Sequence, residues 1–136
     1  YTGAVSIRNV VAKEYVSRRN GTIIGISSVA GDRGRASKLI YASAKAAFTT
    51  YLSGLRNLCF PANVHVMTVL PGFVDTKMTA GQPLPGLITA QPAEVAHIIY
   101  TAYRKSRNIV YIKWYWRYIM FVIKMIPEFQ FKKMNL

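Results

Sequence analysis

Cysteine is almost absent from this chain of 136 residues, and Cys59 is the only one. A single thiol excludes an internal disulfide and has no second cysteine at the spacing of a metal site. We therefore expect no metal centre, and we interpret Cys59 as a small apolar residue packed near a helix end. We interpret His65, within an expected buried strand, as a satisfied structural histidine rather than a ligand. His97 has no acidic or Cys partner at metal-ligand spacing, and we assign neither histidine a functional role.

Acidic residues are also scarce, with 5 Asp and Glu against 18 Lys and Arg and a formal net charge of +13. Residues 1–100 hold ten basic against four acidic side chains, whereas residues 101–136 hold eight against one. In that last quarter the basic residues are interleaved with aromatic and aliphatic ones. This pattern suits an anionic membrane surface at least as well as nucleic acid.

The chain lacks an initiator Met and a charged-then-apolar signal segment. Its first residues, YTGAVSIRNVVAKEYV, have the pattern of a helix interior, so we expect the N-terminal half of the protein to be absent from this sequence. The length matches one domain, and 51% hydrophobic residues are enough to bury a core.

Helical and strand-like segments alternate along the chain. Runs of β-branched and apolar residues predict buried strands, and apolar residues at helical spacing, bounded by Gly or Pro, predict helices. The strands are expected at 22–26, 64–70 and 108–112, and the helices at 5–18, 37–60 and 92–104. The Gly- and Pro-rich stretch 73–90 predicts a mobile loop.

Apolar strands that alternate with helices predict an α/β fold with a parallel sheet covered on both faces. We expect the C-terminal part of a doubly wound, Rossmann-type sheet over residues 1–112. A basic, aromatic, amphipathic tail is expected over residues 113–136.

Tyr41 and Lys45 are four residues apart on the expected long helix, so they share one face. An ammonium group beside a phenol favours the phenolate and makes it a better acid–base group near neutral pH. Taken alone this spacing is weak, because helices produce it by chance.

The context of the pair is more specific. Ser28 follows the first strand and precedes Tyr41 by thirteen residues, and Pro71 and Gly72 follow the second strand. The carboxyl ends of parallel strands form the crevice where open α/β sheets bind ligands. These features therefore predict one site at one edge of the sheet.

The segments ISSVAG, YASAK and VLPGFVDT resemble the short-chain dehydrogenase/reductase family in order and spacing. The resemblance implies a catalytic set of Ser28, Tyr41 and Lys45, in which the Ser holds the substrate carbonyl. Tyr41 would exchange the proton, and Lys45 would bind the nicotinamide ribose and tune Tyr41. The spacing favours Ser28 over its neighbour Ser27 as the catalytic serine.

The same resemblance implies a cofactor, NAD or NADP, that is held by Tyr41, by Lys45 and by the segment after the second strand. In that segment the contacts are expected from Pro71, Gly72, Val74 and Thr76. The family's glycine-rich turn and its helix Asn are not in this sequence, so we expect the 136 residues alone to be inactive.

The tail KWYWRYIMFVIKMIPEFQFKKMNL is too short and interrupted for a spanning helix, which needs about 20 apolar residues. Lys113, Arg117 and Lys124 fall on one narrow stripe of a helix, with large apolar residues over the rest. The stripe predicts a helix lying in a membrane interface, and a helix that packs on the domain or in a dimer is the alternative. We expect no nucleic-acid binding, because the pattern offers no stacking platform.

The tail also resembles the branch of the family formed by decaprenylphosphoryl-2-ketoribose reductases. The matching segments are 28–35, with the pattern S-V-A-G-D-R-x-R, then RYIM at 117–120 and IPEFQFKK at 126–133. The resemblance implies a bacterial enzyme of cell-wall or surface polysaccharide synthesis that reduces a 2-keto sugar on a polyprenyl phosphate. Arg33 and Arg35 either pair with the substrate phosphate or are ordinary solvated loop charges.

Other functions stay open at this point. A reductase of a soluble steroid-like or acyl substrate is one alternative, and a non-catalytic membrane-associated scaffold of the same fold is another. By resemblance we expect a homodimer or tetramer, with an oxidase as a further partner. The expected location is the cytoplasm, peripheral to the membrane.

Overall fold

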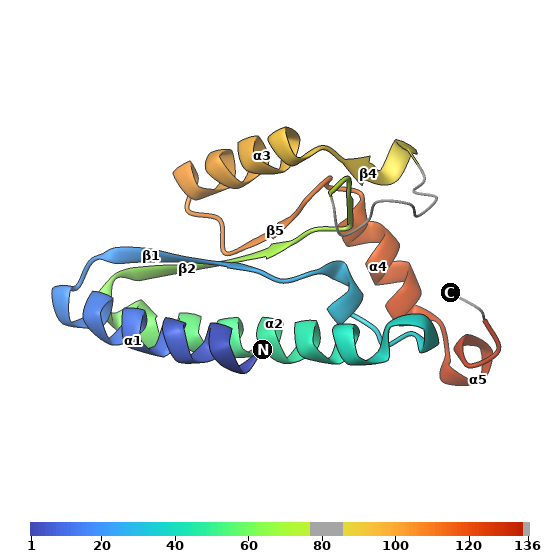
Figure 1. Cartoon of the computed structure of the whole chain (residues 1–136), viewed down its shortest axis with the longest axis horizontal. Coiled ribbons are helices and arrows are strands. Elements are labelled where there is room, and N and C mark those ends of the chain that lie inside the picture. Colours follow the sequence, from blue (N-terminus) through green and yellow to red (C-terminus); the bar gives the residue numbers. More distant parts are fainter. Residues whose placement is uncertain (77–85, 135–136) are drawn as a thin grey trace.

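The computed structural model describes residues 1–76 and 86–134. Figure 1 shows helices on both sides of a central set of strands. The α-helices are α1 (Thr2–Arg18), α2 (Leu39–Cys59), α3 (Pro92–Arg104), α4 (Trp116–Met125) and α5 (Glu128–Phe131). The strands are β1 (Gly21–Ile26), β2 (Val64–Leu70), β3 (Phe73–Val74), β4 (Thr89–Ala90) and β5 (Ile109–Tyr111). Short 3-10 turns lie at 29–31, 36–38, 60–62 and 86–88.

The main sheet has the order β1-β2-β5, and both pairs are parallel. β1 pairs along its whole length with β2, from Gly21 opposite Val64 to Ile26 opposite Val69. The carboxyl ends of the strands therefore meet at one edge, as the sequence predicts. The α/β fold with a parallel sheet is confirmed.

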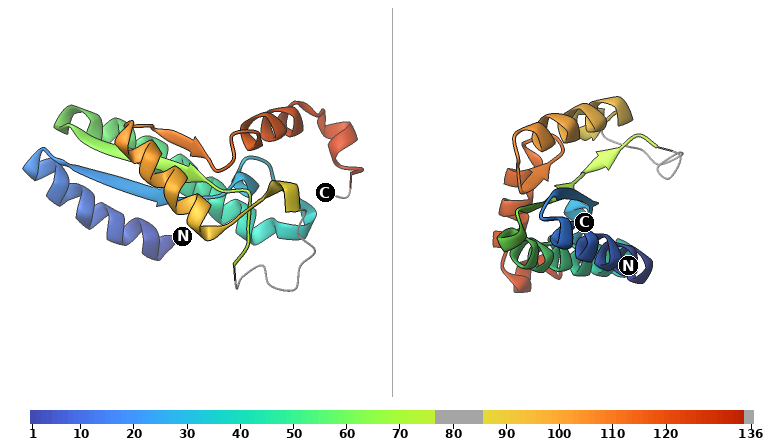
Figure 2. Two further views of the ribbon diagram at one scale, coloured as in Figure 1. Left: turned by 90° about the horizontal axis from the view of Figure 1, so that it is seen from above. Right: turned by 90° about the vertical axis from the view of Figure 1, so that its left-hand side faces the viewer.

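Each face of the sheet has its own core. On one face α1 and α2 cover β1 and β2, and α3 lies on the opposite face (Figures 1 and 2). The first core includes Leu52, Cys59 and Val66, all 0% exposed, and the second joins Met67 and Val69 to Ala102 of α3. The buried position of Cys59 agrees with its interpretation as a packing residue.

The tail folds back on the sheet as two helices, α4 and α5. Lys113 is not part of the expected helical stripe, because it lies before α4 with a positive φ and pairs with Glu94 at 3.3 Å. Trp116 and Met120 of α4 pack against Val29 and Leu70 at the carboxyl ends of β1 and β2. Pro127 lies between α4 and α5, where it cannot continue the first helix. One face of α4 is thus part of the third core, and the other face points outward.

The stretch 73–90 is not wholly a loop, so this prediction is wrong in part. β3 and β4 pair in parallel, with Phe73 opposite Thr89 and Val74 opposite Ala90. Strands of two residues are too short to produce a periodic pattern in a sequence. The rest of the expected loop, residues 77–85, lies outside the described residues.

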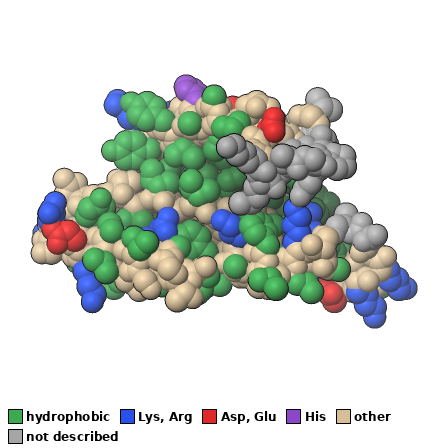
Figure 3. All heavy atoms as spheres, in the orientation of Figure 1, with side chains coloured by type: hydrophobic (Ala, Val, Ile, Leu, Met, Phe, Trp, Pro, Cys, Tyr) green, Lys and Arg blue, Asp and Glu red, His purple; other side chains and the backbone are tan. Residues whose placement is uncertain are grey.

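Hydrophobic side chains gather on the face shown in Figure 3, over α3 and the strands below it. Among the described residues, none of the helices is both long and apolar enough to cross a bilayer.

Candidate active site

Tyr41 and Lys45 lie on successive turns of α2, at the end of the helix nearest the carboxyl edge of the sheet. The Lys45 ammonium lies 5.7 Å from the centroid of the Tyr41 ring. Tyr41 is 41% exposed, whereas Lys45 is half-buried and its Nζ donates a hydrogen bond to the Ile26 carbonyl oxygen at 3.0 Å. The two side chains therefore meet beside the end of β1.

The electrostatic surroundings of Lys45 disfavour its charged form. Burial lowers the pKa of the Lys45 ammonium, and the nearby guanidinium of Arg8 lowers it further. Arg8 itself lies over the Phe48 ring, 4.8 Å from its centroid, and donates to the Ile24 carbonyl oxygen at 3.3 Å. Arg8 was not identified from the sequence. The available signal was its position as a lone cation on the apolar side of α1, at helical spacing from Val11 and Tyr15.

Ser28 joins β1 to the turn that follows β2. Its Oγ accepts a hydrogen bond from the Ala30 amide at 3.2 Å and donates to the Pro71 carbonyl oxygen at 3.4 Å. The Val29 amide donates to the same Pro71 oxygen at 3.0 Å. Ser28 is 7% exposed, so its hydroxyl is buried at the carboxyl edge of the sheet.

Ser27 has a different position from its neighbour. Its hydroxyl lies 2.7 Å from that of Thr49 and donates to the Lys45 carbonyl oxygen at 3.0 Å. Alternation of side chains after the strand turns Ser27 toward the α2 backbone and Ser28 toward Pro71. The assignment of the substrate contact to Ser28 stays a prediction, and this geometry is compatible with it.

Gly72 lies under the Trp116 ring. A Cβ added at Gly72 would overlap Nε1 of that ring, so no larger residue fits without moving the indole. Close approach of α4 is therefore a structural reason for glycine here, independent of any cofactor. The sequence missed this role because the two residues are far apart in the chain.

The two remaining expected cofactor contacts lie just beyond Gly72. Val74 is half-buried in β3, and Thr76 is exposed at the end of the described segment. The Asp75 amide between them donates to the Ala90 carbonyl oxygen at 3.0 Å, which fixes this segment on β4.

Arg33 binds the carboxyl end of α4. Its guanidinium donates to the carbonyl oxygens of Ile123 and Ile126, the latter at 2.7 Å, and pairs with Glu128 at 3.0 Å. A cation at this position satisfies carbonyls that have no partner within the helix. Arg33 is therefore not an ordinary solvated loop charge. None of these hydrogen bonds joins it to a residue of the expected catalytic set.

Arg35 points toward the same helix but is less completely bonded. Its Nη2 lies 3.8 Å from the Met120 sulfur, and its buried Nε has no hydrogen-bond partner among the described residues. Of the two arginines, Arg35 thus has the less complete set of hydrogen bonds in the described part of the chain, and its unpaired Nε is buried. Within the same described ranges, no cluster of three His, Cys, Asp or Glu side chains could hold a metal ion.

Residues 1–84 match the family model for short chain dehydrogenases. An uncharacterised oxidoreductase of Mycobacterium tuberculosis is 30% identical over 134 residues, which are 98% of this chain and 53% of the relative. A 3-oxoacyl-[acyl-carrier-protein] reductase of Chlamydia muridarum is 37% identical over 83 residues, or 59% of this chain and 34% of that protein.

The fold has close counterparts among solved structures. A short chain dehydrogenase from Burkholderia cenocepacia, solved in complex with NADP, superposes with a TM-score of 0.81 at 24% identity, over 96% of this chain and 52% of that one. The chain thus spans about half the length of these relatives. With the matched family model, the parallel sheet and the YASAK helix, the chain belongs to the short-chain dehydrogenase family.

Proposed function

We propose that the protein containing this chain is an NAD(P)H-dependent carbonyl reductase whose proton donor is Tyr41. The observation that carries the proposal is the meeting of Tyr41 and Lys45 beside the end of β1, where Ser28 is bonded to Pro71. A scaffold that only retained the fold has no need of all three side chains at one edge.

The residues present fit the nicotinamide end of a dinucleotide. The Lys45 ammonium has three donors, of which the Ile26 carbonyl takes one, so others can bind ribose hydroxyls. Val74 through its backbone and Thr76 through its hydroxyl would hold the carboxamide, beside Pro71 and Gly72. The pyrophosphate would need residues outside this sequence, and we expect the 136 residues alone to be inactive.

A bound nicotinamide supplies the hydride, and the protein supplies the proton and the orientation. The Ser28 hydroxyl is held by a long hydrogen bond of 3.4 Å to Pro71, which a substrate carbonyl oxygen can replace. Tyr41, 41% exposed, can then reach the same oxygen and protonate the alkoxide as it forms. Lys45 favours the phenolate that remains, because its positive charge lies close to the ring.

For the substrate, we propose a 2-keto sugar carried on a polyprenyl phosphate. The three segments that resemble the decaprenylphosphoryl-2-ketoribose reductases contact one another in space. Arg33 and Arg35, from the first segment, bind Ile126, Glu128 and Met120 of the other two. The two arginines of this cluster lie in the loop just before Tyr41, and Arg35, with fewer hydrogen bonds to the protein than Arg33, would pair with the substrate phosphate.

Such a substrate is anchored in a membrane, so the proposal includes a peripheral membrane location and an oxidase that forms the ketone. A homodimer or tetramer is part of the same proposal. Reduction of a 3-oxoacyl substrate is the second candidate, and the 37% identity to the Chlamydia reductase over 83 residues favours it.

The test uses the whole protein with NADPH or NADH and each ketone class in turn, followed by nicotinamide absorbance. Tyr41→Phe should lower turnover about 10²- to 10⁴-fold, the usual contribution of a general acid, and leave cofactor binding nearly unchanged. Tyr51→Phe, on the same helix, is the matched control and should retain activity. Undiminished turnover in Tyr41→Phe would exclude the proposed mechanism, and preference for 3-oxoacyl substrates would replace the sugar assignment.

A further inference from the structure

The outward side of α4 is apolar where a surface helix is normally polar. Its large side chains are mostly exposed: Tyr118 61%, Phe121 62%, Val122 62% and Met125 68%. Trp114, just before the helix, is 74% exposed. We call these five residues the α4 outer face.

The exposure of the α4 outer face does not result from poor packing of the helix, because the opposite side of α4 is well buried. Trp116 is 5% exposed and Met120 is 1% exposed, and both lie in the core against Val29 and Leu70. The helix therefore has two apolar sides, of which only one has a partner in the described structure. A contiguous exposed apolar surface of this kind marks an interaction site.

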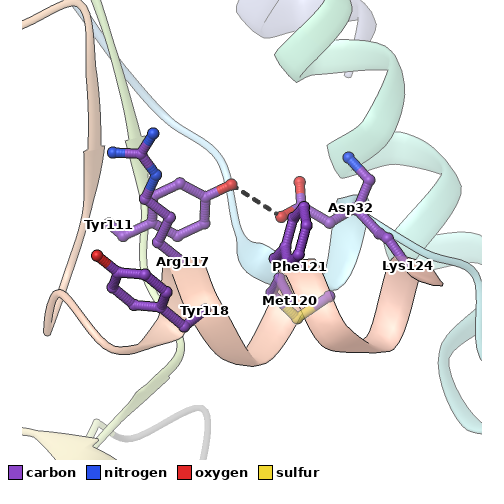
Figure 4. Close-up of a pocket in the computed structure, with 7 residues that line it drawn as sticks. All are labelled: Asp32, Tyr111, Arg117, Tyr118, Met120, Phe121 and Lys124. Carbon is purple, nitrogen blue, oxygen red and sulfur yellow. Dashed lines mark hydrogen bonds between the residues drawn. The ribbon is translucent and has the colours of Figure 1, made fainter. Parts of the chain in front are cut away.

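Basic side chains border the α4 outer face. Arg117 and Lys124 are exposed, each about one helical turn from Phe121, and α4 contains no acidic residue. In Figure 4 both cations extend from α4 on either side of the hydrogen bond between Tyr111 and Asp32. Lys132 and Lys133, after α5, add two further exposed cations.

Two acidic side chains lie near this surface. Glu128 pairs with Arg33, and Asp32, the one acidic side chain lining the cavity of about 470 Å³ between Arg117 and Lys124, accepts the hydroxyl of Tyr111 at 3.1 Å. The surface therefore offers an apolar, aromatic centre with a net basic border.

The positive charge of Arg117 and Lys124 indicates which kind of partner fits the α4 outer face. A second copy of this chain would bring Arg117 and Lys124 against their own counterparts across a two-fold axis, with no acid on α4 to pair with them. An anionic bilayer instead accepts cations at its phosphates and aromatic rings at headgroup depth. We propose that the α4 outer face, bordered by Arg117 and Lys124, docks the protein on an anionic lipid surface.

This docking deepens the peripheral membrane location in the proposed function, but it involves neither the substrate nor the cofactor. Tyr41 and Lys45 lie outside the α4 outer face. Loss of reductase activity and loss of vesicle binding are therefore separate outcomes, and one can occur without the other. The two can be measured on the same preparation, one with vesicles and no substrate, the other with substrate and no vesicles.

The experiment is co-sedimentation of the whole protein with vesicles of phosphatidylcholine alone or mixed with phosphatidylglycerol. Binding should require the anionic lipid and fall with added salt. Arg117→Gln with Lys124→Gln should weaken it about thirtyfold, because each cation near an anionic surface contributes about 1 kcal/mol. Phe121→Ser with Met125→Ser should weaken it at least as much.

Matched controls come from α1. Ile7→Ser with Val10→Ser removes two side chains of similar exposure, 67% and 71%, and should leave vesicle binding unchanged. Failure of the wild-type protein to sediment with anionic vesicles would overturn the proposal. So would equal binding by the Phe121/Met125 variant, or light scattering that shows this variant breaking a dimer, which would assign the face to a second copy.

Discussion

Arg33 and Glu128 form an ion pair of 3.0 Å between the loop that leads into the Tyr41 helix and the last helix of the described chain. The Arg33 side chain is 14% exposed, and its guanidinium also lies 3.7 Å from the centroid of the Phe131 ring. One side chain thus fastens α4 and α5 to the loop between Ser28 and Tyr41. Through its contacts Arg33 links the tail to the loop that precedes the candidate active site.

Replacement of Arg33 should release that connection. Arg33→Ala removes charge-assisted hydrogen bonds to the end of α4, and we expect a loss of about 2 kcal/mol in the free energy of unfolding. Hydrogen exchange should become faster in residues 116–131 before it does in β2. Arg18→Ala is the control, since its exposed ion pair with Glu14 is worth at most about 1 kcal/mol. Equal exchange rates in both variants would contradict this role of Arg33.

Gly31 allows the same loop to approach α2. A Cβ at this position would lie 2.7 Å from the Ala46 nitrogen and 2.8 Å from the Lys45 carbonyl carbon, and backbone atoms cannot rotate aside. Gly31→Ala should therefore cost about 1–3 kcal/mol of stability, the usual penalty of overpacking. Gly34→Ala, three residues later, meets nothing within 4 Å and is the matched control. Denaturant unfolding of the two variants measures the difference.

Gly72→Ala should displace the Trp116 indole, because the added methyl group would overlap the ring. We expect a shift of tryptophan fluorescence toward that of a solvated indole and a loss of about 1–3 kcal/mol. Trp114 also emits, but it is already 74% exposed, so a Trp114→Phe background isolates the signal. Gly54→Ala, in open space on α2, should leave the spectrum unchanged. An unshifted Gly72→Ala spectrum would mean that the contact has little weight.

The sequence predicted the elements that carry long, regular patterns. The helix around Tyr41 and the strand at 64–70 were located within two residues, because burial imposes a period over many positions. The β3–β4 pair and the contacts of Arg33 were not foreseen. Both depend on residues more than ten positions apart that no local pattern relates.

The candidate site shows the same division. The spacing of Ser28, Tyr41 and Lys45 could be interpreted from the sequence, since one helical turn and one strand end determine their positions. The lowered pKa of Lys45 could not be, because it depends on burial and on Arg8 from another helix. The shift in the pKa of Lys45 depends on which groups lie close to it in three dimensions, and residue type alone does not predict it.

Tyr111 should make the stability of the protein depend on alkaline pH. Burial and the neighbouring Asp32 carboxylate raise the pKa of Tyr111 to about 12, whereas an unfolded tyrosine has a pKa of about 10. Because the folded value is the higher one, the stability linked to this phenol is complete below about pH 10 and is lost as the pH rises toward about 12. Tyr111→Phe should therefore show a smaller decline in the free energy of unfolding across that range, by up to about 2 kcal/mol. Urea unfolding at both ends of the range measures it, with Tyr103→Phe as the exposed control; parallel declines in wild type and Tyr111→Phe would rule out the linkage.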